Sequence, residues 1–276
     1  MKQYHNRTRR SKSIPRELVR ARKPYLIPVY YLMLTSDLGR EGIHNSGSYR
    51  FADHVYSGKP KGRLIIGRWL DSLLLRLPSA RAFRARYVFA KREIRRVVEE
   101  LGGEDEPIAV LSTPCGYARE LFEVVDELRV AHPAACDRLH MHGLDLDPDL
   151  IEEVRRRSEA GGYLTEFIVG DALDPADYPT RYDIIISMGF TEFLDDDLAL
   201  KFYRLMRDQL AAGGTFVTSG MRPHTLSDYL LRNIGEVHTH YRSEQDLRSL
   251  CERAGFRVAR AYQDPTGLQT MVVAER

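Results

Sequence analysis

The sequence predicts an α/β fold, in which helices cover both faces of a mostly parallel β-sheet. From Pro107 onward, short apolar runs alternate with amphipathic runs of helical spacing, as expected for a parallel sheet. The clearest unit is residues 108–122, with the sequence IAVLSTPCGYARELF. Its first residues predict a buried strand, Pro114 and Gly116 prevent regular structure, and a helix is predicted from Arg119. Such a turn places backbone N–H groups at the carboxyl edge of the sheet, where open α/β folds bind ligands.

Four further strands follow in the same pattern. Their sequences are HGLDLDPD from His142, FIVGDAL reaching Asp171, YDIIISMG from Tyr182, and LAAGGTFVTS from Leu210, in which a Gly-Gly turn precedes the strand. This succession resembles the class I S-adenosylmethionine-dependent methyltransferases over about residues 106–276. The resemblance implies a doubly wound, seven-stranded, mostly parallel sheet with an antiparallel last strand. It also implies S-adenosylmethionine as the cofactor.

The resemblance places a cofactor site at the strand ends. Asp145 would accept hydrogen bonds from the ribose hydroxyls, Asp171 would bind the adenine amino group, and the turn after the first strand would wrap the methionine part. The implied cofactor-binding residues are Arg86, Thr113, Pro114, Gly116, Asp145, Leu146, Gly170, Asp171, Ala172, Ser187, Met188 and Gly189. Pro114 and Ala118 stand where the family has glycines.

Two of these carboxylates have a structural alternative. Asp147 could replace Asp145 at the ribose, or it could cap the helix that begins near Pro148. Asp171 could instead form an Asx-turn after its strand. Both alternatives stay open at the level of the sequence.

Composition limits the class of protein. The chain has 276 residues, 43% hydrophobic and 29% charged, with a net charge of +2, which fits a soluble globular protein rather than a polyelectrolyte binder. Three cysteines without CxxC spacing predict neither a disulfide framework nor a metal site, and favour the cytoplasm. No apolar run is long enough to span a bilayer, and the basic N-terminus lacks the apolar region of a secretory signal. We therefore expect no membrane insertion.

Three regions are expected along the chain. Residues 1–24 contain nine Lys or Arg and only Glu17 as an acid, which indicates a solvated, partly disordered terminus rather than a nucleic-acid arm. Residues 25–105 form a helical lid, and residues 106–276 form the S-adenosylmethionine-binding domain with an insertion at about 220–243. Within the lid, residues 35–60 contain four glycines and predict a loop-rich segment over the site.

Helices are predicted for the rest of the lid. A short helix within residues 25–34 would bury Leu26, Ile27 and Leu32. Residues 63–77 carry a wide apolar stripe that ends at Pro78 and favours core packing or a homodimer seam over a membrane-surface helix. A second long helix is predicted over residues 84–101.

The lid also holds the residues expected to bind a methyl acceptor. Their mixed charge suits a small, amino-acid-like zwitterion rather than an apolar molecule or a polymer. These residues are Tyr30, Tyr31, Arg40, Glu41, His44, Asn45, Tyr49, Arg50 and Asp53. Candidates for a general base are His44, Tyr49, His54 and His224, but no relay spacing selects one. A thioether acceptor such as methionine would need no base.

The predicted function is methyl transfer to a small polar metabolite on N, O or S, by proximity and desolvation. A nicotinamide oxidoreductase would need a G-x-G-x-x-G turn, which is absent. Residues 187–190 lack the Asn/Asp-Pro-Pro-aromatic motif of amino-methylating nucleic-acid enzymes. The alternatives are a catalytically silent binding or assembly domain of this fold, and a nucleic-acid-directed methyltransferase that uses the basic N-terminus.

Overall fold

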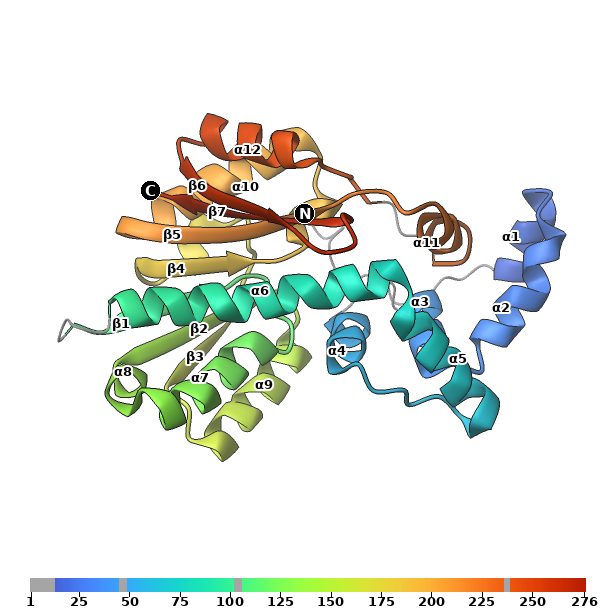
Figure 1. Cartoon of the computed structure of the whole chain (residues 1–276), viewed down its shortest axis with the longest axis horizontal. Helices are drawn as coiled ribbons and strands as arrows, with labels where there is room; N and C mark the ends of the chain where they lie inside the picture. Colours follow the sequence, from blue (N-terminus) through green and yellow to red (C-terminus); the bar gives the residue numbers. More distant parts are fainter. Residues whose placement is uncertain (1–12, 45–48, 102–105, 236–238) are drawn as a thin grey trace. The chain divides into compact units, whose positions relative to one another are not determined.

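The computed structural model describes residues 13–44, 49–101, 106–235 and 239–276. The chain divides into two compact units, and the division falls inside helix α6 (Pro78–Glu100). Unit 1 comprises residues 1–84 and 223–239, and unit 2 comprises residues 85–222 and 240–276. The insertion predicted at about residues 220–243 therefore falls largely into unit 1. Figure 1 labels the elements of both units.

Unit 2 is built on a seven-stranded sheet with the order β3-β2-β1-β4-β5-β7-β6 (Figure 1). The strands are β1 (Ile108–Ser112), β2 (Leu139–Asp145), β3 (Thr165–Val169), β4 (Tyr182–Ser187), β5 (Leu210–Met221), β6 (Arg257–Gln263) and β7 (Gln269–Glu275). Every pair from β3 to β5 is parallel, whereas β7 is antiparallel to both β5 and β6. The predicted doubly wound sheet with an antiparallel last strand is confirmed.

Helices cover both faces of this sheet. They are α7 (Arg119–Ala131), α8 (Pro133–Asp137), α9 (Pro148–Gly161), α10 (Asp196–Gln209) and α12 (Glu244–Arg253), with the 3-10 turns η3 (Pro175–Asp177) and η4 (Phe190–Phe193). Figure 1 shows α7 and α9 on one face and α10 and α12 on the other. Lys91 of α6 binds Glu123 of α7 at 2.8 Å, and Phe89 of α6 packs against Tyr262 of β6. The unit 2 part of α6 therefore crosses the sheet face that carries α7.

The core of unit 2 is apolar and rich in aromatic rings. Its largest fully buried side chains include Phe122, Tyr182, Phe202, Tyr203 and Phe216. Burial of one such side chain stabilises the fold by about 1.5–3 kcal/mol. Because helices cover both faces, the central strands are apolar along most of their length instead of alternating, as the sequence of β4 shows.

Unit 1 consists of helices in its described residues. They are α1 (Ile14–Arg20), η2 (Pro24–Leu26), α2 (Ile27–Met33), α3 (Asp37–His44), α4 (Tyr49–Ser57), α5 (Leu64–Arg76), the start of α6, α11 (Thr225–Leu230) and the π-helical turn η5 (Leu231–Gly235). One apolar cluster contains Ile14, Leu18, Leu26, Ile43 and Ile234. A second contains Leu38, Val55 and Leu75.

Helices α3 and α4 replace the loop-rich segment predicted for residues 35–60, so that prediction was wrong. The glycines misled it, because Gly39 and Gly42 lie buried inside α3. A Cβ at Gly39 would lie 2.4 Å from the carbonyl oxygen of Met33, so glycine permits a close backbone approach there rather than a turn. The prediction that Leu32 is buried was also wrong, because Leu32 is 46% exposed. Leu26 is buried as predicted.

Pro78 separates two helices and belongs to the second. It follows the end of α5, as predicted, and it also occupies the first position of α6. Proline is well tolerated there because the first N–H groups of a helix have no partner within the helix. The helix predicted from Arg84 therefore starts earlier than expected.

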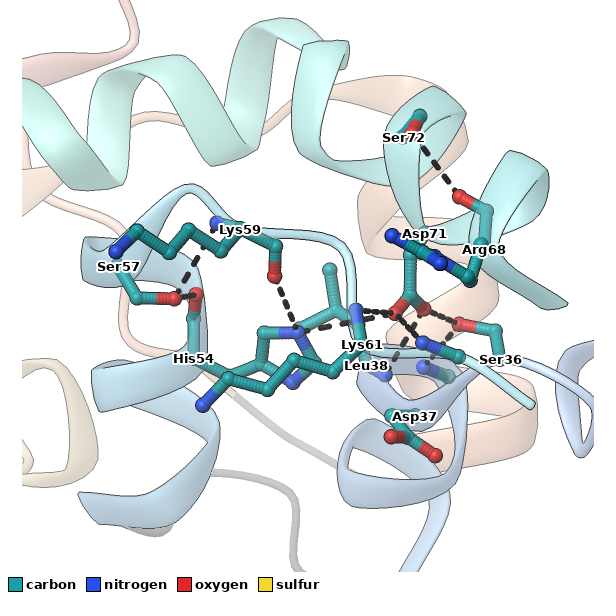
Figure 2. A network of polar contacts seen from close by, with 12 residues as sticks. Ser36, Asp37, Leu38, His54, Ser57, Lys59, Lys61, Arg68, Asp71 and Ser72 are labelled. Atoms are coloured by element: carbon teal, nitrogen blue, oxygen red, sulfur yellow. Dashed lines mark hydrogen bonds and ion pairs between the residues drawn. The ribbon is translucent and has the colours of Figure 1, made fainter.

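A buried carboxylate, Asp71 of α5, is the polar centre of unit 1 (Figure 2). One carboxylate oxygen accepts hydrogen bonds from the Ser36 hydroxyl and from the Leu38 N–H. The other accepts from the N–H groups of Lys61 and Gly62 at 2.8 and 2.6 Å. Asp71 thus connects the start of α3 and the segment before α5 to α5 itself, and four donors compensate its buried charge.

Among the described residues, no helix is both long and apolar enough to span a bilayer.

Candidate functional site

The parallel strands β1, β2, β3 and β4 end at one edge of the unit 2 sheet. Strand order reverses between β1 and β4, which are neighbours in the sheet. In open α/β sheets the connections on either side of such a point leave in opposite directions, and the crevice between them binds ligands. The strands end at Ser112, Asp145, Val169 and Ser187. Apart from Arg86 of α6, the predicted cofactor residues lie at these ends or within four residues after them.

The turn after β1 is tied to the neighbouring strand. Thr113 is fully buried, and its N–H donates to the Ile186 carbonyl of β4 at 2.9 Å. Gly116 and Ala118 have φ values of +51° and +47°, in the left-handed region. That conformation costs an L-residue about 1–2 kcal/mol, and Ala118 occupies one of the two positions where glycine was expected. Its methyl group is buried, and this packing offsets part of the strain.

Asp145 holds this turn against the end of β2. Its Oδ2 accepts from the Gly116 N–H at 3.1 Å, and its Oδ1 accepts from the Asp147 N–H at 3.2 Å. Burial raises the pKa of Asp145, because the charged form loses water. Each oxygen keeps a second lone pair, so the carboxylate can still accept hydrogen bonds from a diol.

Asp147 caps the next helix, which is the structural role predicted for it as one of two alternatives. Its Oδ1 accepts from the N–H groups of Asp149 and Leu150 at 3.0 and 3.2 Å. Asp147 is therefore the N-cap of α9.

Gly143 explains why a glycine precedes Asp145 by two residues. A Cβ at Gly143 would lie 2.4 Å from the Phe167 ring and 3.1 Å from Cys115 Sγ. The side chains of β3 and of the turn after β1 therefore leave no room at this position. Burial raises the pKa of the Cys115 thiol, which makes it a packing group rather than a nucleophile.

The end of β3 combines an Asx-turn with a tyrosine that sequence reasoning missed. Asp171 Oδ1 accepts from the Leu173 N–H at 2.9 Å, and the Asp171 N–H donates to Asp177 Oδ2 at 2.7 Å. The predicted Asx-turn alternative is thus present, and it leaves the second oxygen of Asp171 for a ligand donor. The Tyr178 hydroxyl donates to the Ala172 carbonyl at 2.8 Å. No motif in the sequence marked Tyr178.

The end of β4 carries a buried ion pair. Arg86 Nη1 lies 3.2 Å from Glu192 Oε1, and Gln269 Nε2 donates to the same oxygen at 3.4 Å. Gly189 has φ +85°, and a Cβ there would lie 2.3 Å from Arg86 Nη1. Burial raises the pKa of Glu192, and the nearby Arg86 opposes that rise. Arg86, predicted to contact the cofactor, is thus paired with a protein carboxylate.

Four buried polar atoms at the neighbouring strand positions lack hydrogen-bond partners within the described residues. They are Ser187 Oγ, Ser219 Oγ, Gln269 Oε1 and Thr270 Oγ1. Residues 187 and 218 pair across β4 and β5, and residues 220 and 270 pair across β5 and β7. An unsatisfied buried polar group costs about 1–3 kcal/mol. Because paired residues share a face and successive residues alternate, Ser187 and Thr270 lie on one face of the sheet and Ser219 and Gln269 lie on the other.

The hairpin before β7 is held by Asp264. Its Oδ1 accepts from the N–H groups of Leu268 and Gln269 at 2.9 and 2.8 Å. Its Oδ2 accepts from the Thr266 N–H at 2.9 Å. Asp264 thereby sets where β7 begins, and so it sets the positions of Gln269 and Thr270.

The raised pKa of Glu192 gives a pH-dependent prediction. Between the ordinary glutamate pKa of about 4.3 and the raised folded value, the folded protein holds a proton that the unfolded chain has released. This contribution to stability is complete below the unfolded pKa and is lost as pH rises through the folded pKa. Glu192→Gln cannot titrate. The free energy of unfolding of the parent minus that of Glu192→Gln should therefore be larger near pH 4.5 than near pH 8.

Urea unfolding at the two pH values measures this difference. The matched control is Glu252→Gln, at an exposed glutamate of the same unit, for which the pH-dependent change should be small. If the free energy of unfolding of the parent minus that of Glu192→Gln instead grows as pH rises, the raised pKa of Glu192 is contradicted.

The residues predicted to bind the acceptor lie in unit 1. Tyr30 and Tyr31 of α2 form an edge-to-face pair with centroids 5.1 Å apart. Arg40 pairs with Asp37 within α3, and Arg50 lies over the Tyr49 ring on α4 at 5.8 Å. Glu41 and His44 lie on α3 and Asp53 lies on α4, whereas Asn45 falls outside the described residues. Their binding role stays a prediction.

Two of the histidines predicted as general bases contact polar groups of unit 1. His54 is buried, with Nε2 3.2 Å from the Lys59 carbonyl oxygen and 3.8 Å from Asp71 Oδ2 (Figure 2). His224 Nδ1 lies 3.0 Å from Ser227 Oγ at the start of α11. The structure thus gives each of them a role in holding unit 1. Within the described part of the chain, no three His, Cys, Asp or Glu side chains form a group that could hold a metal ion.

A family model described as "Putative methyltransferase" matches residues 28–276. The chain belongs to this methyltransferase family. The match includes helices of unit 1 from α2 onward as well as the whole sheet of unit 2. The methyltransferase resemblance inferred from the strand ends is therefore confirmed.

Individual relatives of this chain are distant in sequence. The uncharacterized protein YnbC of Escherichia coli is 23% identical over 252 residues, which cover 87% of this chain and 41% of YnbC. The chain thus spans less than half the length of that relative. A crystal structure of "a possible exported protein" from Bordetella parapertussis has 22% identity and a TM-score of 0.75, and covers 93% of this chain and 87% of that one.

Magnesium protoporphyrin IX methyltransferase from Synechocystis PCC 6803, solved with bound S-adenosylmethionine, has 13% identity and a TM-score of 0.52. It covers 81% of this chain and 90% of that one. At these identities the likeness to solved structures shows that the fold is shared.

Proposed function

We propose that this chain transfers the methyl group of S-adenosylmethionine to a small polar acceptor. The observation that carries the proposal is the set of strand ends at one sheet edge, in a chain of a methyltransferase family. Asp145 accepts a hydrogen bond from the glycine-containing turn, and Asp171 uses only Oδ1 in its Asx-turn. Ser187 Oγ is a buried polar atom that lacks a partner within the described residues. A nucleoside with a charged tail would supply donors and acceptors for all three.

The residues present fit this cofactor. Asp145 would accept from the ribose hydroxyls with the lone pairs left over from Gly116 and Asp147. Asp171 would accept from the adenine amino group. The backbone between Thr113 and Gly116 would border the methionine part. When bound, the cofactor supplies a methyl group on a sulfonium, which a lone pair of the acceptor attacks in line.

The acceptor we propose is an amino-acid-like metabolite, methylated on N, O or S. Support comes from α3 and α4, where cationic and anionic side chains alternate over a short span. Such pairs suit the carboxylate and ammonium groups of a zwitterion. No base is assigned, which agrees with an acceptor that loses no proton in the transition state, such as a thioether. We place the reaction in the cytoplasm, since all three cysteines are free thiols.

Two measurements on the purified full chain test this function. Calorimetric titration with S-adenosylmethionine, S-adenosylhomocysteine and NAD should show binding of the first two only. Release of S-adenosylhomocysteine should then be seen with amino acids or small amines, and not with phenols, fatty acids or RNA. Cofactor binding with no turnover on any compound would favour a silent binding domain. Turnover confined to RNA would favour the nucleic-acid-directed alternative.

A further inference from the structure

Helix α5 of unit 1 presents an apolar surface to solvent. We define the α5 face as Leu64, Ile65, Ile66, Trp69 and Leu73, whose exposed fractions are 85, 87, 61, 64 and 46%. Residues 65, 69 and 73 are spaced by four, and residues 66, 69 and 73 by three and four, so most of the face is one stripe. The opposite stripe, with Gly67, Leu70 and Leu75, is buried. Of the two roles predicted for this apolar stripe, core packing holds only for the buried half, and the homodimer seam stays a prediction.

Cations surround the α5 face. Lys59, Lys61, Arg63, Arg68 and Arg76 are all exposed. Across the part of the chain that the structure describes, no carboxylate forms an ion pair with any of the five. The only acid between residues 59 and 81 is Asp71, which is buried and uses both oxygens on unit 1 donors. The surroundings of the face are therefore positive and lack an exposed counter-charge in this stretch of sequence.

The positive charge near the α5 face indicates which kind of partner binds there. A second copy of the chain, docked through the same face about a two-fold axis, would bring like cations together. An anionic lipid surface matches both features, since apolar side chains enter the acyl boundary while Lys and Arg meet the headgroups. Tryptophan is well suited to this interface because its ring is largely apolar and its N–H is polar. We propose that the α5 face docks unit 1 onto a membrane surface rich in anionic phospholipid.

This docking is peripheral and independent of the proposed methyl transfer. It uses side chains of one amphipathic helix, not a spanning segment. It requires neither the strand ends of unit 2 nor a cofactor. A negative result for methyl transfer therefore does not contradict membrane docking, and a negative result for docking does not contradict methyl transfer.

The chain contains a native probe for the experiment, because Trp69 is its single tryptophan. The full chain is mixed with vesicles of phosphatidylcholine alone or of phosphatidylcholine with phosphatidylglycerol, and Trp69 emission and acrylamide quenching are recorded. We expect a blue shift and loss of quenching only with phosphatidylglycerol, and reversal of both by added salt. Equal responses to the two vesicle types, or no response to either, would overturn the proposal.

Variants separate the apolar and the electrostatic contributions to vesicle binding in a co-sedimentation assay. Ile65→Ser and Leu73→Ser should each weaken binding about tenfold, and Arg63→Glu and Arg68→Glu at least about fivefold each. Matched controls lie in unit 2, namely Val130→Ser at an 86% exposed valine and Arg156→Glu on the exposed side of α9. Circular dichroism confirms that each variant is folded. Equal losses of vesicle binding in the control variants would refute the proposal that the α5 face is the docking surface.

The competing occupants give their own results. A blue shift of Trp69 that appears with protein concentration in the absence of vesicles would show that a second copy covers the face. Protection of Trp69 from acrylamide at every dilution, without vesicles, would show that the chain covers the face itself. Either result would overturn the proposal.

Discussion

Asp71→Asn is expected to lower the stability of unit 1 by about 3–5 kcal/mol. The substitution keeps the shape of the side chain, so it leaves no cavity. It replaces one carboxylate oxygen with an NH2 group, which then faces N–H donors from Lys61 and Gly62 or donors from Ser36 and Leu38. Buried donors that lose their acceptor pay their full desolvation cost.

Urea unfolding followed by Trp69 fluorescence measures this loss, because Trp69 lies two residues from Asp71 on the same helix. The midpoint should fall by more than about 1 M urea. Ser72→Ala is the matched control, since the Ser72 hydroxyl donates to the Arg68 carbonyl one turn earlier on the same helix (Figure 2). Its effect should stay within about 0.5 kcal/mol. A comparable fall in both variants would show that Asp71 is not the centre of unit 1.

Asp145→Ala is expected to weaken S-adenosylhomocysteine binding by about 1.5–3 kcal/mol, which is roughly tenfold to 150-fold in Kd. The lost charge-assisted contacts to the ribose account for most of this loss of binding free energy. Loss of the Gly116 hydrogen bond to Asp145 adds to it, because the turn then has one anchor fewer. The folded state should persist, since the sheet pairing of β2 does not use this side chain.

Isothermal titration of parent and variant gives the Kd values. Asp147→Asn is the control two residues away, because asparagine caps a helix as well as aspartate does and Asp147 serves α9. Its Kd should match that of the parent. If Asp145→Ala binds like the parent while Asp147→Asn binds weakly, the ribose contact belongs to Asp147.

The parallel strands were predictable from the sequence because they are apolar runs with Asp or Gly at or soon after their ends, and that pattern depends on local chemistry alone. Asp145 and Asp171 were found by their places after strands. Tyr178 and Gln269 were not, since a tyrosine between turns and a glutamine at the start of a strand carry no local signal. Their contacts near the strand ends are made with segments distant in sequence: the Tyr178 hydroxyl lies 3.5 Å from Thr113 Oγ1, and β7 pairs with β5.

Unit 1 was harder to predict for a related reason. Glycines are frequent in turns, but Gly39 and Gly42 serve close packing between helices, and that need is set by partners elsewhere in the chain. The α5 helix was predicted correctly as a helix, whereas the sequence left open whether its apolar stripe packs in the core or forms a homodimer seam. A wide apolar stripe has the same spacing whether it faces a core or solvent.

The reversed direction of β7 has a consequence for how such a chain can diversify. A parallel strand reaches the site edge with its last residue, but β7 arrives there with its first, immediately after the hairpin fixed by Asp264. An insertion or deletion of one residue in that hairpin would turn every β7 side chain to the opposite face, whereas a change of two would keep the faces and exchange the residues at the edge. Even-numbered length changes in this hairpin are thus a route by which substrate preference could drift while the core stays intact.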